Sequence, residues 1–160
     1  MKKQRKQKGF TLIELLVVVA IIAVVTGIAI PKYLSARTTS MENAGAAVTR
    51  SLGTAFTAHQ QRWNTFPATA DLIGGNCTPS VPPTAAASCN IEDAVAKAVK
   101  NGTPIGQYIA TYAQTGSGAG FTLNLDPVTG SNAQRHYFME EGLAIHVNPT
   151  AAATATDPLI

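Results

Sequence analysis

The longest uninterrupted feature of the chain is an apolar run from Phe10 to Ile30, which follows a basic segment, Met1–Gln7. The run holds about 21 residues, and as an α-helix rising about 1.5 Å per residue it covers roughly 31 Å. That length matches a bilayer hydrocarbon core of about 30 Å. Glu14 is the one charge inside it, and a carboxylate there costs roughly 2.5–3.5 kcal/mol on insertion scales. The pattern predicts a membrane-spanning helix in which Glu14 needs a partner or a function.

After the run, apolar side chains recur at spacings of three and four, which indicates an amphipathic helix. The stripe consists of Met41, Ala44, Val48, Leu52, Ala55, Phe56 and His59. We expect one helix from about Phe10 to Trp63, ended by the segment that leads to Pro67 because the residue before a proline avoids the α region. The stripe then faces a sheet, and His59 is a buried, hydrogen-bonded histidine rather than a ligand. Pro31 has no N–H, so it is expected to kink or locally open the helix over Gly27–Pro31.

The rest of the chain predicts short elements and a sheet. A helical turn is expected at 69–73, and a helix at 91–100 capped by Asn90 and followed by Gly102. Ile91, Ala94, Val95, Ala98 and Val99 form its expected inner face. Strands are expected at 107–113, 121–125, 136–139 and 143–147, the second from its alternation of apolar and polar residues. The expected fold class is therefore α+β: a long N-terminal helix, half apolar and half amphipathic, packed on a roughly four-stranded antiparallel sheet.

Two ordinary explanations of the N-terminus leave features unexplained. A secretory signal peptide has an apolar core of about 7–15 residues and then a small-residue cleavage site, whereas this run is longer and ends without one. A plain membrane anchor, oriented by the basic segment, accounts for everything except Gly9-Phe10 and Glu14.

Those residues carry a family resemblance. The segment Lys8-Gly9-Phe10-Thr11-Leu12-Ile13-Glu14-Leu15 resembles the class III signal of type IV pilins and of the pseudopilins of type II secretion. The resemblance covers roughly residues 8–38, and Pro31 stands where the family has a proline. It implies cleavage between Gly9 and Phe10 by prepilin peptidase, a membrane-embedded aspartyl peptidase, and methylation of the new amine on Phe10 by the same enzyme. It also implies the ladle-shaped pilin fold.

Cleavage changes how the charge is interpreted. The chain has 12 Lys and Arg and 9 Asp and Glu, a net charge of +3. Five of the cations precede Gly9, so the chain from Phe10 carries 7 − 9 = −2. The basic isoelectric point belongs mostly to the leader, and it is no argument for nucleic-acid binding.

The resemblance gives Glu14 an assembly role. Cleavage creates a cationic amine at Phe10, and a carboxylate one helical turn along can neutralise the amine of a neighbouring subunit or its own. Glu14 is then expected to set the axial register of a filament. The alternative is a glutamate that reaches the membrane interface from near the helix end.

Cys77 and Cys89 lie in the part expected outside the cytoplasm, where an even cysteine count favours a disulfide. The closed loop of about 13 residues would contribute roughly 3 kcal/mol in the chain-entropy model. A metal site is disfavoured because no histidine or further cysteine is near in sequence, and Asp157 alone is too little for calcium in the tail. His59, His136 and His146 have no ligand spacing. No cofactor, metal or catalytic constellation is expected, and we expect no enzyme.

We expect six segments: a cleaved leader 1–9, an assembly and membrane helix 10–31, its amphipathic continuation 32–63, a helix-to-sheet loop with the disulfide and a short helix 64–105, a sheet 106–148, and a loosely held low-complexity tail 149–160. The expected function is that of a non-enzymatic pilin, with its C-terminal domain outside the inner membrane before assembly and in an extracellular pilus afterwards. Its expected partners are other copies in a helical filament, prepilin peptidase, and the inner-membrane assembly platform with its ATPase.

The resemblance implies adhesion, twitching motility or DNA uptake, and contact with nucleic acid only through the last. Two other functions stay open. One is a type II secretion pseudopilin. The other is a membrane-tethered binding domain that never polymerises.

Overall fold

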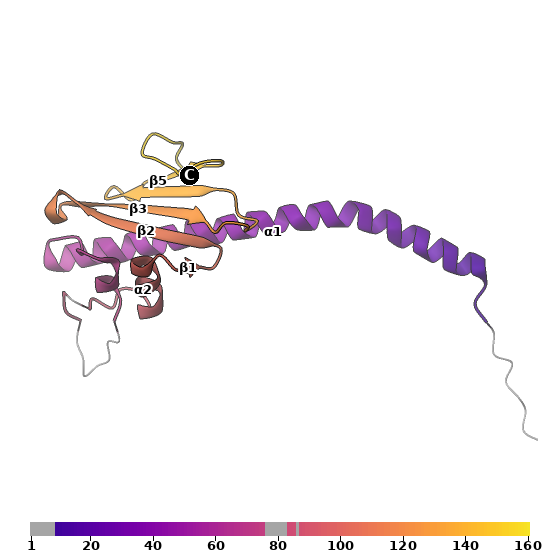
Figure 1. Ribbon diagram of the computed structural model, residues 1–160, viewed down its shortest axis with the longest axis horizontal. Helices are drawn as coiled ribbons and strands as arrows, with labels where there is room; N and C mark the ends of the chain where they lie inside the picture. The colour runs from indigo at the N-terminus through magenta and orange to yellow at the C-terminus, as the bar shows by residue number, and fades with distance from the viewer. Residues whose placement is uncertain (1–8, 76–82, 86) are drawn as a thin grey trace, which may run out of the picture. The chain divides into compact units, whose positions relative to one another are not determined.

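The computed structural model describes residues 9–75, 83–85 and 87–160 (Figure 1). Its elements are α1 (Leu12–Trp63), the 3-10 turn η1 (Ala70–Ile73), α2 (Asp93–Asn101), β1 (Pro104–Ile105), β2 (Tyr108–Thr115), the turn η2 (Gly116–Gly118), β3 (Gly120–Pro127), β4 (His136–Glu140) and β5 (Ile145–Asn148). The chain divides between Arg37 and Thr38 into two compact units. We describe each unit by itself.

The N-terminal unit is helical from Leu12 onward, and its side chains from Phe10 to Ala36 are exposed. α1 continues through Pro31 as helix. Since proline has no N–H, the carbonyl of Gly27 lacks the usual partner four residues along. A kink or local opening at Gly27–Pro31 remains a prediction.

In the unit from Thr38 onward, the second half of α1 carries an antiparallel sheet with the strand order β1-β2-β3-β4-β5 (Figure 1). Each strand pairs with the next along the chain. The expected α+β class, with a long helix on an antiparallel sheet, is confirmed. The sheet has five strands rather than about four, because Pro104–Ile105 pairs with the start of β2. A strand of two residues is too short to show alternation in the sequence.

The predicted stripe is confirmed except at Ala44, since Met41 and Val48 are partly buried and pack against the core. Leu52, Ala55, Phe56 and His59 are buried, whereas Ala44 is exposed. The helix face against the sheet also includes Gly45, Ala46, Thr49 and Gly53. A Cβ on Gly45 would lie 2.5 Å from Cε2 of Tyr108, and one on Gly53 would overlap Sδ of Met139. The buried face is wider than the predicted stripe because Gly45 and Gly53 leave room for large side chains of the sheet, and glycine gives no signal in a hydrophobic pattern.

We predict that Gly45→Ala lowers the free energy of unfolding by about 1–3 kcal/mol, because the methyl group overpacks the contact with Tyr108. The gain in helix propensity, up to about 1 kcal/mol, offsets only part of this loss. Gly142→Ala is the matched control, since a Cβ there meets nothing within 4 Å. Denaturant unfolding of the solubilised chain measures both variants. Equal stability of the two variants would contradict the packing argument.

Polar contacts also join β4 to α1. The hydroxyl of Tyr137 donates to the carbonyl oxygen of Glu42 at 2.7 Å. The Nε of Arg135 lies 3.1 Å from Oε2 of Glu42, whose side chain is 12% exposed. Both contacts bring one end of β4 to the first turns of the amphipathic helix.

α2 is confirmed as a helix, but its predicted N-cap is wrong. The cap residue is Glu92, which makes no side-chain cap bond. The side-chain amide of Asn90 instead donates to the carbonyl of Ala55 at 3.1 Å and to Oγ of Ser88 at 3.0 Å. Asn90 therefore ties this segment to α1. Gly102 ends the helix in the left-handed region, at φ 64°, as predicted.

The inner face of α2 is narrower than predicted. Val99 is buried as expected, and Ala96, which the pattern did not select, is buried as well. Ala94 is exposed, and Ile91, Val95 and Ala98 are half-buried. The helix contacts η1, β1 and β2.

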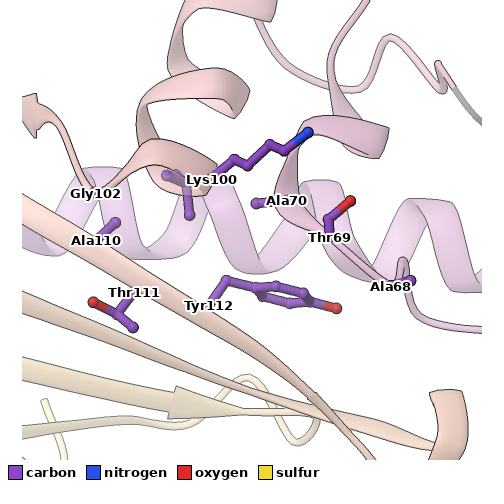
Figure 2. Close-up of a pocket in the computed structure, with 9 residues that line it drawn as sticks. Ala68, Thr69, Ala70, Lys100, Gly102, Ala110, Thr111 and Tyr112 are labelled. Atoms are coloured by element: carbon purple, nitrogen blue, oxygen red, sulfur yellow. The ribbon is translucent and has the colours of Figure 1, made fainter.

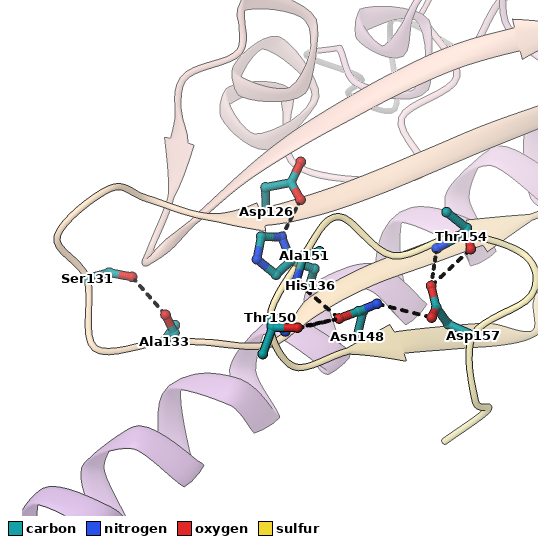
Figure 3. A network of polar contacts seen from close by, with 9 residues as sticks. All are labelled: Asp126, Ser131, Ala133, His136, Asn148, Thr150, Ala151, Thr154 and Asp157. Carbon is teal, nitrogen blue, oxygen red and sulfur yellow. Dashed lines mark hydrogen bonds and ion pairs between the residues drawn. The ribbon is translucent and has the colours of Figure 1, made fainter.

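The expectation of a loosely held tail is wrong. The amide of Val147 donates to the carbonyl of Pro158 at 2.9 Å, and that of Ile160 donates to Ile145 at 3.1 Å. The tail therefore pairs with the free edge of β5. Figure 3 shows the side chains that shape it: Asn148 accepts hydrogen bonds from Thr150 and Ala151 and donates to Asp157. The Ala- and Thr-rich composition of the tail does not predict this ordered conformation, because it depends on the hydrogen bonds of Asn148 and Asp157 and on pairing with β5.

Asp157 gives the tail a pH dependence. Its carboxylate accepts hydrogen bonds from the backbone N–H and the hydroxyl of Thr154 at 2.7 and 3.0 Å, and these bonds hold the pKa of Asp157 below its usual value. Because the folded-state pKa is lowered, the stabilisation is present above the unfolded-state pKa and is lost as pH falls through the folded-state pKa. Protection of the Val147 and Ile160 amides against hydrogen exchange should fall in that acidic range. Asp157→Asn should reduce it at neutral pH, and Asp93→Asn, on α2, should not. Unchanged protection in Asp157→Asn would contradict this role.

Candidate functional site

α1 begins with a reciprocal cap built from Thr11 and Glu14. The backbone N–H of Glu14 donates to Oγ1 of Thr11 at 3.2 Å, and the backbone N–H of Thr11 donates to Oε2 of Glu14 at 2.8 Å. The Thr11 hydroxyl also donates to Oε2, at 2.8 Å. This is the capping box of a Thr and a Glu three residues apart. The capping role of Thr11 was not predicted from the sequence, although Thr-x-x-Glu before an apolar run is the signal that identifies it.

The cleavage-site residues predicted from the sequence, Gly9 and Phe10, lie just before the first helical turn. A Cβ on Gly9 would meet nothing within 4 Å, and the Phe10 side chain is 86% exposed. The bond between them is therefore outside helical hydrogen bonding and accessible, which is what a peptidase requires of its substrate. Lys8 and the rest of the basic segment lie outside the described residues.

The helix that follows presents apolar side chains on every side. The exposed large side chains of this segment are Phe10, Leu12, Ile13, Leu15, Leu16, Val17, Val18, Val19, Ile21, Ile22, Val24, Val25, Ile28 and Ile30. Within the described part of the chain, α1 is the single helix long and apolar enough to cross a membrane. A surface of this size without a cover is a site for lipid or for another chain.

Two shallow depressions interrupt this surface. Glu14 lies in one, between Phe10, Ile13, Val17 and Val18. Ala20 lies at the other, between the larger side chains of Leu16, Val17, Ile21, Val24 and Val25. Small residues allow apolar helices to approach one another closely. A Cβ on Gly27 would meet nothing within 4 Å, so the chain's own packing does not require that glycine.

Of the two cysteines of the predicted disulfide, the structure describes Cys89. Cys77 lies outside the described residues. Cys89 has a left-handed backbone, at φ 55°, and its N–H donates to the carbonyl of Gly74 at 3.1 Å. The Cys77–Cys89 pairing remains a prediction.

The histidines serve local structure. His59 is 2% exposed, and its ring nitrogens lie 3.0 and 3.1 Å from the carbonyl oxygens of Thr65 and Ala85, which confirms a buried, hydrogen-bonded histidine. His136 lies 2.6 Å from Asp126 (Figure 3), and Nδ1 of His146 lies 2.6 Å from the carbonyl oxygen of Asp157. Among the described residues, no three histidine, cysteine or acidic side chains are grouped to hold a metal.

A pocket of about 200 Å³ lies between η1, α2 and β2 (Figure 2). Thr69, Thr111 and Lys100 supply its polar side chains, and the hydroxyl of Tyr112 donates to the carbonyl of Pro67 at 2.6 Å. Burial raises the pKa of Tyr112. No histidine, cysteine or carboxylate is among the described residues that line this pocket.

Comparison with known proteins concerns the same N-terminal segment. Residues 4–30 match the family model described as the prokaryotic N-terminal methylation motif, the class III signal of type IV pilins and pseudopilins. No solved structure matches the chain. The motif supports the pilin or pseudopilin family, which is structural rather than enzymatic. It implies processing by prepilin peptidase, and with the apolar helix it supports membrane anchoring before assembly.

Proposed function

We propose, on the basis of this class III signal, that the protein is a pilin: a structural subunit that polymerises into a type IV pilus after cleavage between Gly9 and Phe10 and N-methylation of Phe10. The observation that carries the proposal is the exposed apolar surface of α1, which holds the single carboxylate of Glu14 next to the cleavage site. Packing these helices against one another replaces contact with lipid.

The cap at the start of α1 supports a direct role for Glu14 in assembly. Thr11 occupies Oε2 of the carboxylate, whereas an ionised carboxylate offers about four lone-pair sites on its two oxygens. Oε1 is therefore available to a cation. Cleavage would create that cation at Phe10, one residue before Thr11.

In a bundle of apolar helices, burying the charged amine of one subunit or the Glu14 carboxylate of its neighbour without a partner would cost free energy of desolvation. As a hydrogen-bonded pair they are tolerated in low dielectric. Because the pair forms at one axial offset between subunits, it fixes the register of the filament.

The globular unit is suited to the outside of such a filament. Its core lies between α1 and the sheet. Five of the large side chains there are completely buried: Leu52, Phe56, Phe121, Leu123 and Leu125. We propose that it lies in the periplasm before assembly and on the pilus surface afterwards, where adhesion, twitching motility or DNA uptake would use it.

Electron microscopy of sheared cell-surface material, combined with immunodetection of the globular unit in each cell fraction, tests the proposal. The pilin assignment predicts filaments that contain the chain outside the cell. Processed chain confined to the periplasm would instead assign it to a type II secretion pseudopilus. Chain retained entirely in the membrane, with no filament, would contradict polymerisation and favour the tethered binding domain.

A further inference from the structure

Three exposed side chains follow directly on the apolar segment of α1: Lys32, Tyr33 and Arg37. We call them the junction cluster. The helix continues without a break through all three, and the Tyr33 side chain is 67% exposed. At 3.6 residues per turn, Lys32 and Arg37 are about 140° apart around the helix axis, with Tyr33 between them. One side of α1 therefore carries the whole cluster.

The junction cluster holds positive charge that the described part of the chain does not neutralise. Between Glu14 and Glu42, the charged residues are Lys32 and Arg37. No carboxylate among the described residues forms an ion pair with either cation. Two exposed cations at the end of an exposed apolar helix surface are suited to an anionic partner that also borders an apolar phase.

The position of the cluster along α1 identifies that partner as lipid. About 20 residues separate the start of the helix at Leu12 from Lys32, which is roughly 30 Å of helix and equals the thickness of a bilayer hydrocarbon core. With this segment across a membrane, the cluster lies at the level of the lipid head groups. Tyrosine favours that level because its ring is apolar and its hydroxyl is polar. Lysine and arginine extend their charged ends toward the lipid phosphates.

The same spacing places Glu14 near the opposite surface of the membrane. Eighteen positions separate Glu14 from Lys32, or about 27 Å of helix. If the cluster is held at the outer head groups, the carboxylate stays close to the cytoplasmic surface, where a charge costs much less than at the bilayer centre. The five cations before Gly9 outnumber the two of the cluster, so the N-terminus stays cytoplasmic.

We propose that the junction cluster is a lipid-binding site, which holds the phosphate groups of anionic lipids in the outer leaflet of the inner membrane and thereby fixes the depth of α1. This inference goes beyond the proposed function, because it concerns the single chain in the membrane and needs no filament. Its failure would leave the pilin assignment standing, and an absence of filaments would not affect it.

A depth measurement on the full chain, reconstituted in lipid vesicles, tests the site. A nitroxide label on Ala29→Cys reports the depth of an exposed position near the end of the apolar segment. Its accessibility to oxygen and to a water-soluble nickel chelate, measured by electron paramagnetic resonance, gives that depth. The chain without the added cysteine accounts for any labelling of Cys77 and Cys89.

The test variant is Lys32→Gln/Arg37→Gln, which removes both charges and keeps polar side chains. Its matched control is Arg50→Gln, because Arg50 is also an exposed cation of α1 but lies 20 residues beyond Ile30. Both substitutions are made in the labelled chain, and each is compared with the labelled chain that has neither.

In vesicles of phosphatidylcholine with phosphatidylglycerol, the label of the Lys32→Gln/Arg37→Gln chain should lie deeper by about one helical turn, roughly 5 Å, because Leu34 and Ala36 can then enter the bilayer. The Arg50→Gln chain should show no shift. In vesicles of phosphatidylcholine alone, which has no net charge, the shift should largely disappear.

Three results would overturn the proposal. The first is an unchanged depth of the Lys32→Gln/Arg37→Gln chain in the anionic vesicles. The second is a shift of equal size in both kinds of vesicle, since the charges would then resist burial without binding anionic lipid. The third is an equal shift in the Arg50→Gln chain, which would reflect net charge rather than this site.

Discussion

Replacing Glu14 by Gln should abolish most filament assembly while leaving the chain in the membrane. A glutamine can still accept the N–H of Thr11 and complete the capping box, so the substitution removes the charge and keeps the start of α1. A hydrogen bond to a charged group contributes about 1.5–3 kcal/mol, and each 1.4 kcal/mol corresponds to a factor of about ten. The amount of chain recovered in sheared filaments should therefore fall about 10–100-fold, as measured by quantitative immunoblotting against the membrane fraction.

Thr11→Ala is the matched variant for this experiment. It removes the Thr11 hydroxyl, which both accepts from and donates to Glu14, and it keeps the carboxylate. Loss of a cap costs about 0.5–2 kcal/mol of helix stability, at the end of a long helix that packing with neighbours also supports. We expect assembly to be reduced mildly. If Glu14→Gln assembles normally and Thr11→Ala does not, the role of Glu14 is to cap α1, and the charge-pairing account is wrong.

Gly9→Val should block processing and with it the filament. A Cβ at Gly9 meets nothing within 4 Å in the chain itself, so any loss arises in the peptidase, where even one extra methylene in a fitted pocket changes the rate by about 10–200-fold. The unprocessed chain would keep a peptide bond in place of the Phe10 amine, and it would retain the five cations that precede Gly9. Gel mobility and the mass of the membrane-bound chain measure the effect.

Gly27→Ala is the control for Gly9→Val, since a Cβ at Gly27 also meets open space. It should be processed at the normal rate. Normal processing of Gly9→Val would contradict the assignment of the cleavage site, and a processing defect in both variants would show that the whole segment, rather than Gly9, determines recognition.

The sequence was sufficient wherever a periodic pattern repeated over several turns. Leu52, Ala55 and Phe56 recur at helical spacing and are buried, and Phe121, Leu123 and Leu125 alternate along β3 and are fully buried. At these positions a residue is apolar because it is buried, and the spacing of buried residues differs between a helix and a strand. The helix and the main strands could therefore be predicted from this spacing.

The sequence was insufficient where a glycine or a polar side chain decides the packing. Gly45 and Gly53 lie at the α1–sheet contact because they lack a side chain, and this leaves no hydrophobic signal. Asn90 matches the sequence signature of an N-cap but bonds to Ala55, 35 residues away in sequence, a contact that only the tertiary structure creates. The order of the tail depends on Asn148 and Asp157 in the same way.

At the N-terminus the sequence signal was strong because the motif is local. Gly9, Phe10 and Glu14 are separated by fixed spacings, and the structure adds Thr11 as the residue that orients the carboxylate. The pairing of Glu14 with an amine needs a neighbouring subunit, and a single sequence does not show how that neighbour is placed.

The most direct test of assembly through a processed N-terminus is the intact mass, with N-terminal peptide mapping, of protein sheared from the cell surface. The proposed function predicts a chain that begins at N-methylated Phe10 and is recovered in filaments. A chain that stays in the membrane fraction with Met1 to Gly9 still attached would contradict it.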